Sequence, residues 1–345
     1  MIWEDTLMIN ARKLAIAATT GALAFGFAAE AFAAEVTWNV SLWGNRRAFT
    51  ENVEYLAERV AKESNGRFEI KLHYGASLSK ARENLDGISI GAFEMAQICA
   101  SYHADKNPTL TVLELPFLGV SDLKTEARVS MKLYEQDVVK KDLARWNAIA
   151  FMPTPMPQYN FLGKGEAPTS IKDFDGMRVR ALGGIGELMR AVGAVPTTVT
   201  AAETYQAMES GTVQAASFAP HAHLAFKTVE VGNWWTANMN PGTVQCPVVM
   251  NSDAYAALPD DLKKILDESV QPAVDHYIAN YETVYDRWWP TLKKQEITQV
   301  TFSDAELAAL KEKAAPIWKA WVDKMEAQGI PGQELLDKMQ AEIKG

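Results

Sequence analysis

Arg180 is the residue of this chain whose type and position best suit ligand binding. It closes a short predicted strand, and its guanidinium offers a rigid fork of hydrogen-bond donors that matches a carboxylate. Such a charged pair is strong where water is excluded, so the chemistry would be the capture of an organic acid. An ion pair on the surface or between two domains is the alternative that the spacing leaves open.

Covalent chemistry has less support from the residue pattern. No Gly-x-Ser-x-Gly or His-Glu-x-x-His motif occurs, and no histidine has a convincing catalytic partner. His221 and His223 are two positions apart, so on a helix they would not face the same way, which makes them poor metal ligands. The sequence therefore predicts a protein that is not an enzyme and has no cofactor and no bound metal, with an exported hydrolase or lyase as the competing class.

The residues around Arg180 alternate between strand and helix patterns. The predicted order is strand 177–182, helix 185–192, strand 194–199, helix 201–210 and strand 213–218. This alternation predicts a parallel α/β sheet, whose ligands usually bind at the carboxyl ends of the strands. Arg180 and Phe218 both fall at such ends.

The first 33 residues are predicted to be an export signal that is removed. A basic pair precedes a short apolar run, and Ala31-Phe32-Ala33 fits the small-x-small cleavage rule. The mature chain would begin at Ala34, in the periplasm, and Met8 is an alternative start to Met1. A membrane anchor that stays attached is the other interpretation of this apolar run.

The remaining part, about 310 residues, is long enough for two domains with their own cores. The formal net charge is −9 and no basic cluster occurs, which argues against nucleic acid as a partner. Cys99 and Cys246 both lie in apolar, strand-like runs, where a buried free cysteine is ordinary. We therefore expect free thiols, with a bridge formed in an oxidising periplasm as the alternative.

Three short motifs near Arg180 carry a family resemblance. They are Gly-Ala-x-Pro at 193–196, Glu-x-Tyr at 203–205 and Gly-Thr-Val at 211–213. With the arginine-terminated strand before them, they resemble the extracytoplasmic solute-binding proteins of TRAP transporters, the C4-dicarboxylate-binding, DctP-type family. The resemblance runs from about Val36 to the last predicted helix. It implies that Arg180 forms a salt bridge with a carboxylate of the ligand.

The resemblance also implies a fold, namely α/β with two domains of the periplasmic-binding-protein type (type II-like), hinge strands and a long helix that spans both domains. The expected division is 34–157 plus 245–285 for domain I and 158–244 plus 286–345 for domain II. The long helix falls within residues 260–295, with Pro290 as a kink or break. A single further helix is predicted over residues 305–327.

Further ligand-binding candidates follow from where the resemblance places the cleft. Trp43 follows the first strand, Tyr102 follows the strand over residues 93–100, and Phe218 offers an apolar wall. The candidates with polar side chains are Asn160, Ser217 and Gln245. Family members that bind a keto acid through a cation have a glutamate where this chain has Ser217, which argues against a metal. A purely structural role is the alternative for Trp43.

The expected ligand is a small organic acid with a flat or apolar body. One arginine implies one carboxylate, and Trp43, Tyr102 and Phe218 suit an aromatic body better than a polyol. We therefore expect a keto, hydroxy or aromatic monocarboxylate, with a C4-dicarboxylate as the second choice. The resemblance implies delivery to TRAP membrane permease subunits and a monomeric receptor, with a ligand-binding subunit of a sensory system as the other functional class.

Overall fold

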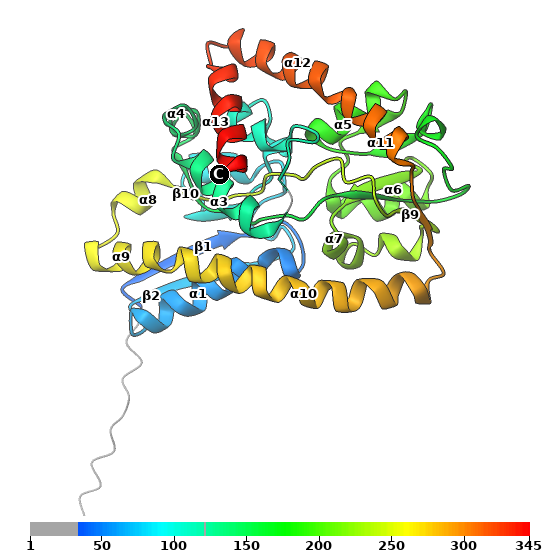
Figure 1. Ribbon diagram of the computed structural model, residues 1–345. Coiled ribbons are helices and arrows are strands. Elements are labelled where there is room, and N and C mark those ends of the chain that lie inside the picture. Colours follow the sequence, from blue (N-terminus) through cyan, green and yellow to red (C-terminus); the bar gives the residue numbers. More distant parts are fainter. Residues whose placement is uncertain (1–33, 121) are drawn as a thin grey trace, which may run out of the picture. The chain divides into compact units, whose positions relative to one another are not determined.

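The computed structural model describes residues 34–120 and 122–345. The predicted export signal and the two candidate start residues lie outside the described residues. Figure 1 shows two β-sheets surrounded by helices, with the long helix α10 running beneath both parts. This arrangement confirms the predicted two-domain α/β fold, whereas the residue boundaries between the domains stay a prediction.

The first sheet has five strands. In sheet order these are β2 (Phe68–His73), β1 (Val36–Ser41), β3 (Met95–Gln97), β10 (Val248–Asn251) and β4 (Ala148–Met152). β1 runs parallel to β2 and to β3, and the late strand β10 inserts antiparallel between β3 and β4. A segment from far along the chain therefore completes the sheet that the first strands begin.

The second sheet has six strands. In sheet order these are β11 (Thr298–Val300), β9 (Trp234–Thr236), β5 (Asn160–Gly163), β8 (Ala215–Phe218), β6 (Arg178–Arg180) and β7 (Val195–Thr197). β6 pairs in parallel with both β7 and β8, which confirms the parallel pattern predicted over residues 177–218. β5 is antiparallel to β8, so the start of β5 lies beside the end of β8.

Helices cover both sheets. The α-helices are α1 (Glu51–Glu63), α2 (Asn84–Ser89), α3 (Leu123–Tyr134), α4 (Asp137–Ala144), α5 (Gly183–Ala191), α6 (Thr204–Glu209), α7 (Pro220–Ala225), α8 (Ser252–Ala256), α9 (Asp260–Glu268), α10 (Val270–Lys294), α11 (Asp304–Glu312), α12 (Ala314–Glu326) and α13 (Gly332–Lys344). Three short 3-10 helices matter for the site, namely η1 (Ala48–Thr50), η2 (Ala100–Tyr102) and η3 (Pro108–Glu114).

The long helix α10 contacts elements associated with both sheets. It packs against α1 and β4, which belong to the part with the first sheet, and against α7, which belongs to the part with the second sheet. Pro290 does not end it, because the helix continues to Lys294. A proline removes one backbone hydrogen bond, and the buried Trp288 and Leu292 on either side hold this turn in place.

The segment after β11 differs from the single helix predicted over residues 305–327. It forms two helices, with α11 ending at Glu312 and α12 beginning at Ala314. Pro316 is the physical reason, because its missing N–H group and its ring disfavour a helix interior but suit the first turn of a new helix. The chain then turns back, and α13 packs against α3 and η3.

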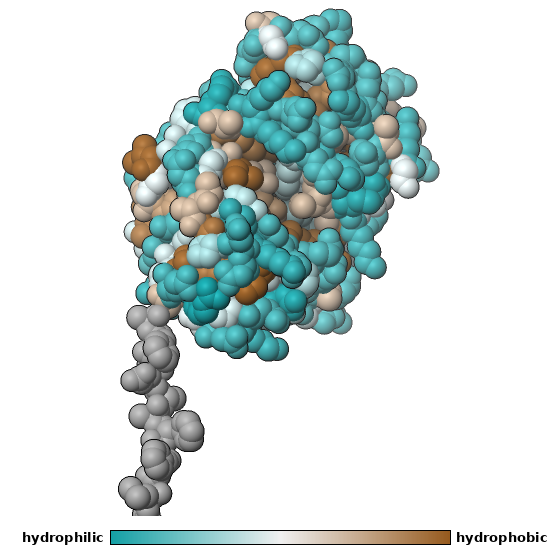
Figure 2. Space-filling view, turned by 90° about the vertical axis from the view of Figure 1, so that its left-hand side faces the viewer, coloured by the Kyte–Doolittle hydropathy of each residue, from teal (hydrophilic) through white to brown (hydrophobic). Residues whose placement is uncertain are grey.

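The surface is mostly polar on the face shown in Figure 2, where hydrophobic residues form small, separate groups. Within residues 34–120 and 122–345, no helix combines the length and the apolar character that a membrane crossing requires.

Candidate functional site

Arg180 and Phe218 meet because their strands are parallel neighbours. β6 ends at Arg180 and β8 at Phe218, so both strands deliver their last residue to the same edge of the second sheet. The centre of the Arg180 guanidinium lies 4.1 Å from the centroid of the Phe218 ring, which is a cation–π contact. The two residues thus lie side by side at the carboxyl ends of their strands, the position that the sequence predicts for both, and they form one wall of the site.

The guanidinium of Arg180 is held by neutral partners. Its Nε donates to the carbonyl of Val199 at 3.1 Å, and one terminal nitrogen donates to the carbonyl of Ser217 at 2.9 Å. The other terminal nitrogen donates to the Tyr102 hydroxyl at 3.0 Å. Arg180 is only 1% exposed, yet no carboxylate among the described residues lies within ion-pair distance of it. A buried cation of this kind favours an anion from outside the chain.

The opposite wall comes from the loops that follow the strands of the first sheet. β1 and β3 are parallel, so the residues after them, Trp43 and Tyr102, lie at one edge. Their rings meet edge to face with centroids 5.9 Å apart. The Trp43 ring also contacts the ring of Phe49 in η1, with a centroid distance of 5.3 Å. Tyr102 joins the walls, because its hydroxyl accepts the hydrogen bond from Arg180.

These walls enclose a small cavity in which about 20 Å³ is free, room for about one water molecule, so an organic acid can enter only after the walls move apart. Four of the predicted site residues line it, namely Arg180, Trp43, Tyr102 and Phe218. A larger groove lies between α5 and α12, but the arginine and lysine side chains that line it are exposed. The enclosed arginine makes the smaller cavity the candidate binding site.

The three predicted polar site residues form hydrogen bonds with other residues of the protein. The Asn160 amide donates to Asn240 at 2.7 Å, and the Gln245 amide donates to Ser130 at 2.8 Å. Ser217 contributes its backbone carbonyl to Arg180, and none of the three predicted residues lines the cavity. Their role as direct ligand contacts gains no support from this geometry.

Cys99 and Cys246 form a disulfide, so the expectation of free thiols is wrong. β3 and β10 are antiparallel neighbours with Gln97 opposite Val248, and continuing this register places the two cysteines opposite each other. Their Cα atoms are 4.0 Å apart. Both cysteines line the cavity, where the bridge forms part of the wall.

The sequence analysis missed several lining residues, and Arg47 is the most important of them. Tyr159, Phe226 and His221 also line the cavity. A signal for Arg47 existed, because it lies in the loop after the first strand, which was already expected to face the cleft. The direction of its side chain could not be read from that position.

The two histidines near the cavity are neutral at physiological pH. Burial lowers the pKa of His221 well below its usual range, with the positive charge of Arg47 adding to the effect. Burial also lowers the pKa of His223 to about 3. The His221 ring lies 2.7 Å from the Tyr281 hydroxyl, and in the described part of the chain no cluster of metal-ligating side chains forms. The positive charge of the cavity therefore comes from arginine.

Comparison with known proteins gives a consistent set of matches. Residues 40–325 match the family described as Bacterial extracellular solute-binding protein, family 7 (DctP). The Ectoine-binding periplasmic protein TeaA of Halomonas elongata is 20% identical over an alignment of 355 positions, which covers 97% of this chain and 98% of TeaA. The C4-dicarboxylate-binding periplasmic protein DctP of Rhodobacter capsulatus is 23% identical over 282 residues, covering 80% and 82%.

Solved structures share the fold. A TRAP solute binding protein from Rhodoferax ferrireducens, in complex with copurified benzoate, superposes with a TM-score of 0.81 at 20% identity and covers 89% of this chain and 97% of its own. A marine metagenome TRAP solute binding protein specific for pyroglutamate gives a TM-score of 0.78 at 23% identity, covering 90% and 100%. A similar protein from Bordetella bronchiseptica, with bound mandelate, gives 0.79 at 22% identity, covering 89% and 98%.

Proposed function

We propose that this chain, which belongs to bacterial extracellular solute-binding protein family 7, the DctP family, captures a small organic acid in the periplasm for a TRAP transporter. The family consists of solute-binding receptors rather than enzymes. In this function the acid binds in the cavity between the two sheets, and the loaded receptor delivers it to the membrane permease subunits. No bond of the ligand is made or broken.

The observation that carries the proposal is the buried guanidinium of Arg180. It is oriented by two backbone carbonyls and one hydroxyl, which fix its position without cancelling its charge. A carboxylate of the ligand supplies the missing negative charge, and the low effective dielectric of an enclosed site strengthens that pair. Receptor closure over the acid would exclude water in this way.

The aromatic walls support a ligand with a flat or apolar body. Trp43, Phe49 and Phe218 present ring surfaces to the cavity, and such surfaces pack well against another ring or a short hydrocarbon. The acids named for the similar solved proteins, benzoate, mandelate and pyroglutamate, are each small and contain a ring.

A thermal-shift screen of residues 34–345 against small organic acids tests this function. The protein is unfolded and refolded first, so that any acid carried through purification is removed. Binding to the folded state alone raises the melting temperature, with about 2.7 kcal/mol of stabilisation at a hundredfold excess over the dissociation constant. A shift with one class of acid is the expected result.

Arg180→Gln should weaken the binding of that acid by about thirtyfold to several-thousandfold, because losing a buried charge partner costs roughly 2–5 kcal/mol. Arg178→Gln is the matched control, since Arg178 lies two residues earlier on the same strand and is exposed. Titration calorimetry measures both variants. Wild-type affinity in Arg180→Gln would show that the anchor is assigned to the wrong residue.

A further inference from the structure

Glu114 ends η3 and lies behind the residues that orient Arg180, with its side chain buried. One carboxylate oxygen accepts from the backbone N–H of Ser101 at 3.3 Å and from that of Gln245 at 3.0 Å. The other oxygen accepts from the Ser101 hydroxyl. Ser101 directly precedes Tyr102 in η2, and the Tyr102 hydroxyl holds the Arg180 guanidinium. Glu114 is therefore joined to the binding site through one short helix.

The part of the protein with the second sheet also reaches Glu114. α5 follows β6, the strand that ends at Arg180, and α5 packs against η3. A Cβ atom on Gly183 would collide with the Glu114 carboxylate, and one on Gly184 would collide with the Glu114 backbone carbonyl. The two glycines are therefore what allows the start of α5 to lie directly on Glu114. This places a buried carboxyl group at a contact between the parts that carry the two sheets.

Opening of the binding cavity would break this contact. The cavity has room for about one water molecule, so its walls must separate before an organic acid enters. Gly183 is three positions after Arg180. A movement that carries the Arg180 wall away from Tyr102 therefore also carries the start of α5 away from Glu114. The Glu114 carboxyl group gains contact with water when the receptor opens and loses it again when the receptor closes.

Burial favours the protonated form of Glu114 in the closed arrangement. It raises the pKa from 4.5 to about 7, although the hydrogen bonds from Ser101 and Gln245 favour the ionised form and oppose the effect. The N-terminus of α5 also favours the ionised form, but the end of a helix changes the pKa of a carboxyl group by less than about 1. The loss of water is therefore the larger effect, and closure strengthens proton binding to Glu114.

Other titratable and charged groups do not cancel this effect. Those that line the groove beside Glu114 or interact with it electrostatically are Glu126, Tyr159, Glu187, Arg190, Lys313 and Lys324. Glu126 and Tyr159 are neutral near pH 7 because burial raises both pKa values, to about 8 for Glu126. His103, which follows η2, is neutral because burial lowers its pKa to about 4. The remaining four side chains are exposed, so water screens their charges.

We infer that Glu114 is a positioning residue that takes up a proton from solution when the receptor closes over its acid. The inference rests on the proposed receptor function and adds its regulation by pH. The N–H groups of Ser101 and Gln245 both bind Oε1, which leaves Oε2 to carry the proton beside the Ser101 hydroxyl. The protonated group can therefore keep η2 and Tyr102 in place without a buried charge against α5.

The sign of the pH dependence follows from proton binding in the two arrangements. Between about pH 4.5 and pH 7 the closed receptor holds a proton on Glu114 that the open receptor has released. The affinity for the acid therefore falls as the pH rises through 7. For a carboxyl group that returns close to its usual pKa on opening, linkage gives binding about eightfold to tenfold tighter at pH 6 than at pH 8, with uptake of about 0.7 to 0.9 proton at pH 6.

Titration calorimetry at pH 6, 7 and 8, in two buffers with different ionisation enthalpies, measures both the affinity and the proton uptake. The probes are benzoate, mandelate and pyroglutamate, the acids named for similar solved proteins. Their carboxyl groups titrate near pH 4 or below and stay ionised throughout this range. We expect the tightest-binding acid to show the stated uptake. Equal affinity at pH 6 and pH 8 without proton uptake would overturn the inference.

Glu114→Gln should bind the acid with an affinity that no longer depends on pH, because an amide has nearly the shape of the protonated acid and does not titrate. Glu126→Gln is the matched control, since it changes a second buried acid in the same way on α3, and it should retain the pH dependence. Ser101→Ala removes a hydroxyl that favours ionised Glu114, so the midpoint should move to higher pH. A folding defect would not move the midpoint. A pH dependence that persists in Glu114→Gln would refute the role of Glu114.

The two proposals can fail separately in these experiments. Acid binding that depends on Arg180 but takes up no proton would sustain the proposed function and overturn the role of Glu114. Failure of all three acids to bind the refolded protein would overturn both.

Discussion

Replacing Glu126 by glutamine should make the protein more stable at pH 8 and leave its stability at pH 5 almost unchanged. Glu126 lies on α3 and is completely buried, and neither of its carboxylate oxygens has a hydrogen-bond partner among the described residues. Burial, together with the nearby Glu114, raises the pKa of Glu126 from 4.5 to about 8. The side chain is therefore protonated in the folded protein near neutral pH.

The sign of the pH dependence follows from proton binding in the two states. Between about pH 4.5 and pH 8 the folded protein holds a proton on Glu126 that the unfolded chain has released. Because the folded state binds more protons, the free energy of unfolding falls as the pH rises through this window. The contribution of the Glu126 proton to the free energy of unfolding is fully present below about pH 4.5 and is lost by about pH 8. At 1.36 kcal/mol for each unit of pKa, this contribution is as much as about 5 kcal/mol.

Urea unfolding of the parent and of Glu126→Gln at pH 5, 6, 7 and 8 measures this effect. An amide stays neutral at every pH and has nearly the shape of the protonated acid, so the difference between the two proteins should grow steadily with pH in favour of the variant. Glu58→Gln, which changes an exposed glutamate on α1, should show no such trend. A difference that is independent of pH, or a parent that gains stability relative to the variant at higher pH, would refute the reasoning.

Two further predictions concern the walls of the cavity. Reduction of the Cys99–Cys246 bridge should lower the free energy of unfolding by about 5 kcal/mol on the chain-entropy estimate, because the bridge spans a sequence separation of 147 residues. Urea unfolding with and without reductant measures this loss. The variant with alanine at both positions is the control, and its stability should not change with reductant. Tyr102→Phe should weaken acid binding by about fivefold to a hundredfold, because the hydroxyl that orients Arg180 is lost and buried donors are left unpaired. Calorimetry against Tyr205→Phe, a change outside the cavity lining, checks the second prediction, and parental affinity in Tyr102→Phe would contradict it.

The part of the site that sequence reasoning predicted depends on local patterns. Arg180 and Phe218 were placed at strand ends by the alternation of strands and helices around them, and parallel pairing of β6 with β8 then brings them together. Trp43 and Tyr102 follow strands of the first sheet in the same way. For these four residues, residue patterns and the family resemblance were sufficient to predict a position at the cavity, because each lies at or just after the end of a strand.

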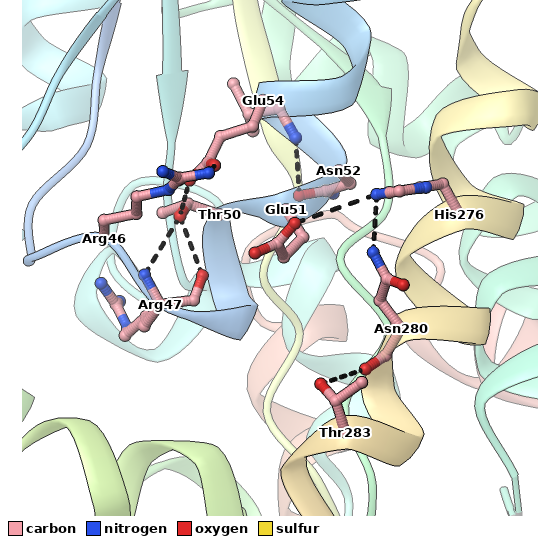
Figure 3. A network of polar contacts seen from close by, with 10 residues as sticks. Arg46, Arg47, Thr50, Glu51, Asn52, Glu54, His276, Asn280 and Thr283 are labelled. Carbon is pink, nitrogen blue, oxygen red and sulfur yellow. Dashed lines mark hydrogen bonds and ion pairs between the residues drawn. The ribbon is translucent and has the colours of Figure 1, made fainter.

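The part that was missed depends on contacts between distant segments. The disulfide requires the register of β10 against β3, which no local pattern encodes. Arg46 forms an ion pair with Glu54 (Figure 3), whereas its neighbour Arg47 packs on rings that line the cavity. Gln245 has the right chemistry for a ligand contact, but its amide donates to Ser130 and Tyr134 of α3 instead. Side-chain type alone cannot resolve such competition.

Among the described residues, the Arg180 guanidinium is bound by neutral groups only, so its positive charge stays available for a ligand. A carboxylate of the protein beside Arg180 would stabilise the guanidinium, but an incoming acid would then have to displace it and would gain little. Carbonyls, a hydroxyl and ring faces orient the cation while leaving its net charge in place. In the proposed function, an acid that contacts Arg180 would therefore gain the full electrostatic attraction on binding. Because the lining residues come from both sheets, a ligand that contacts both walls would favour the closed arrangement of the two domains.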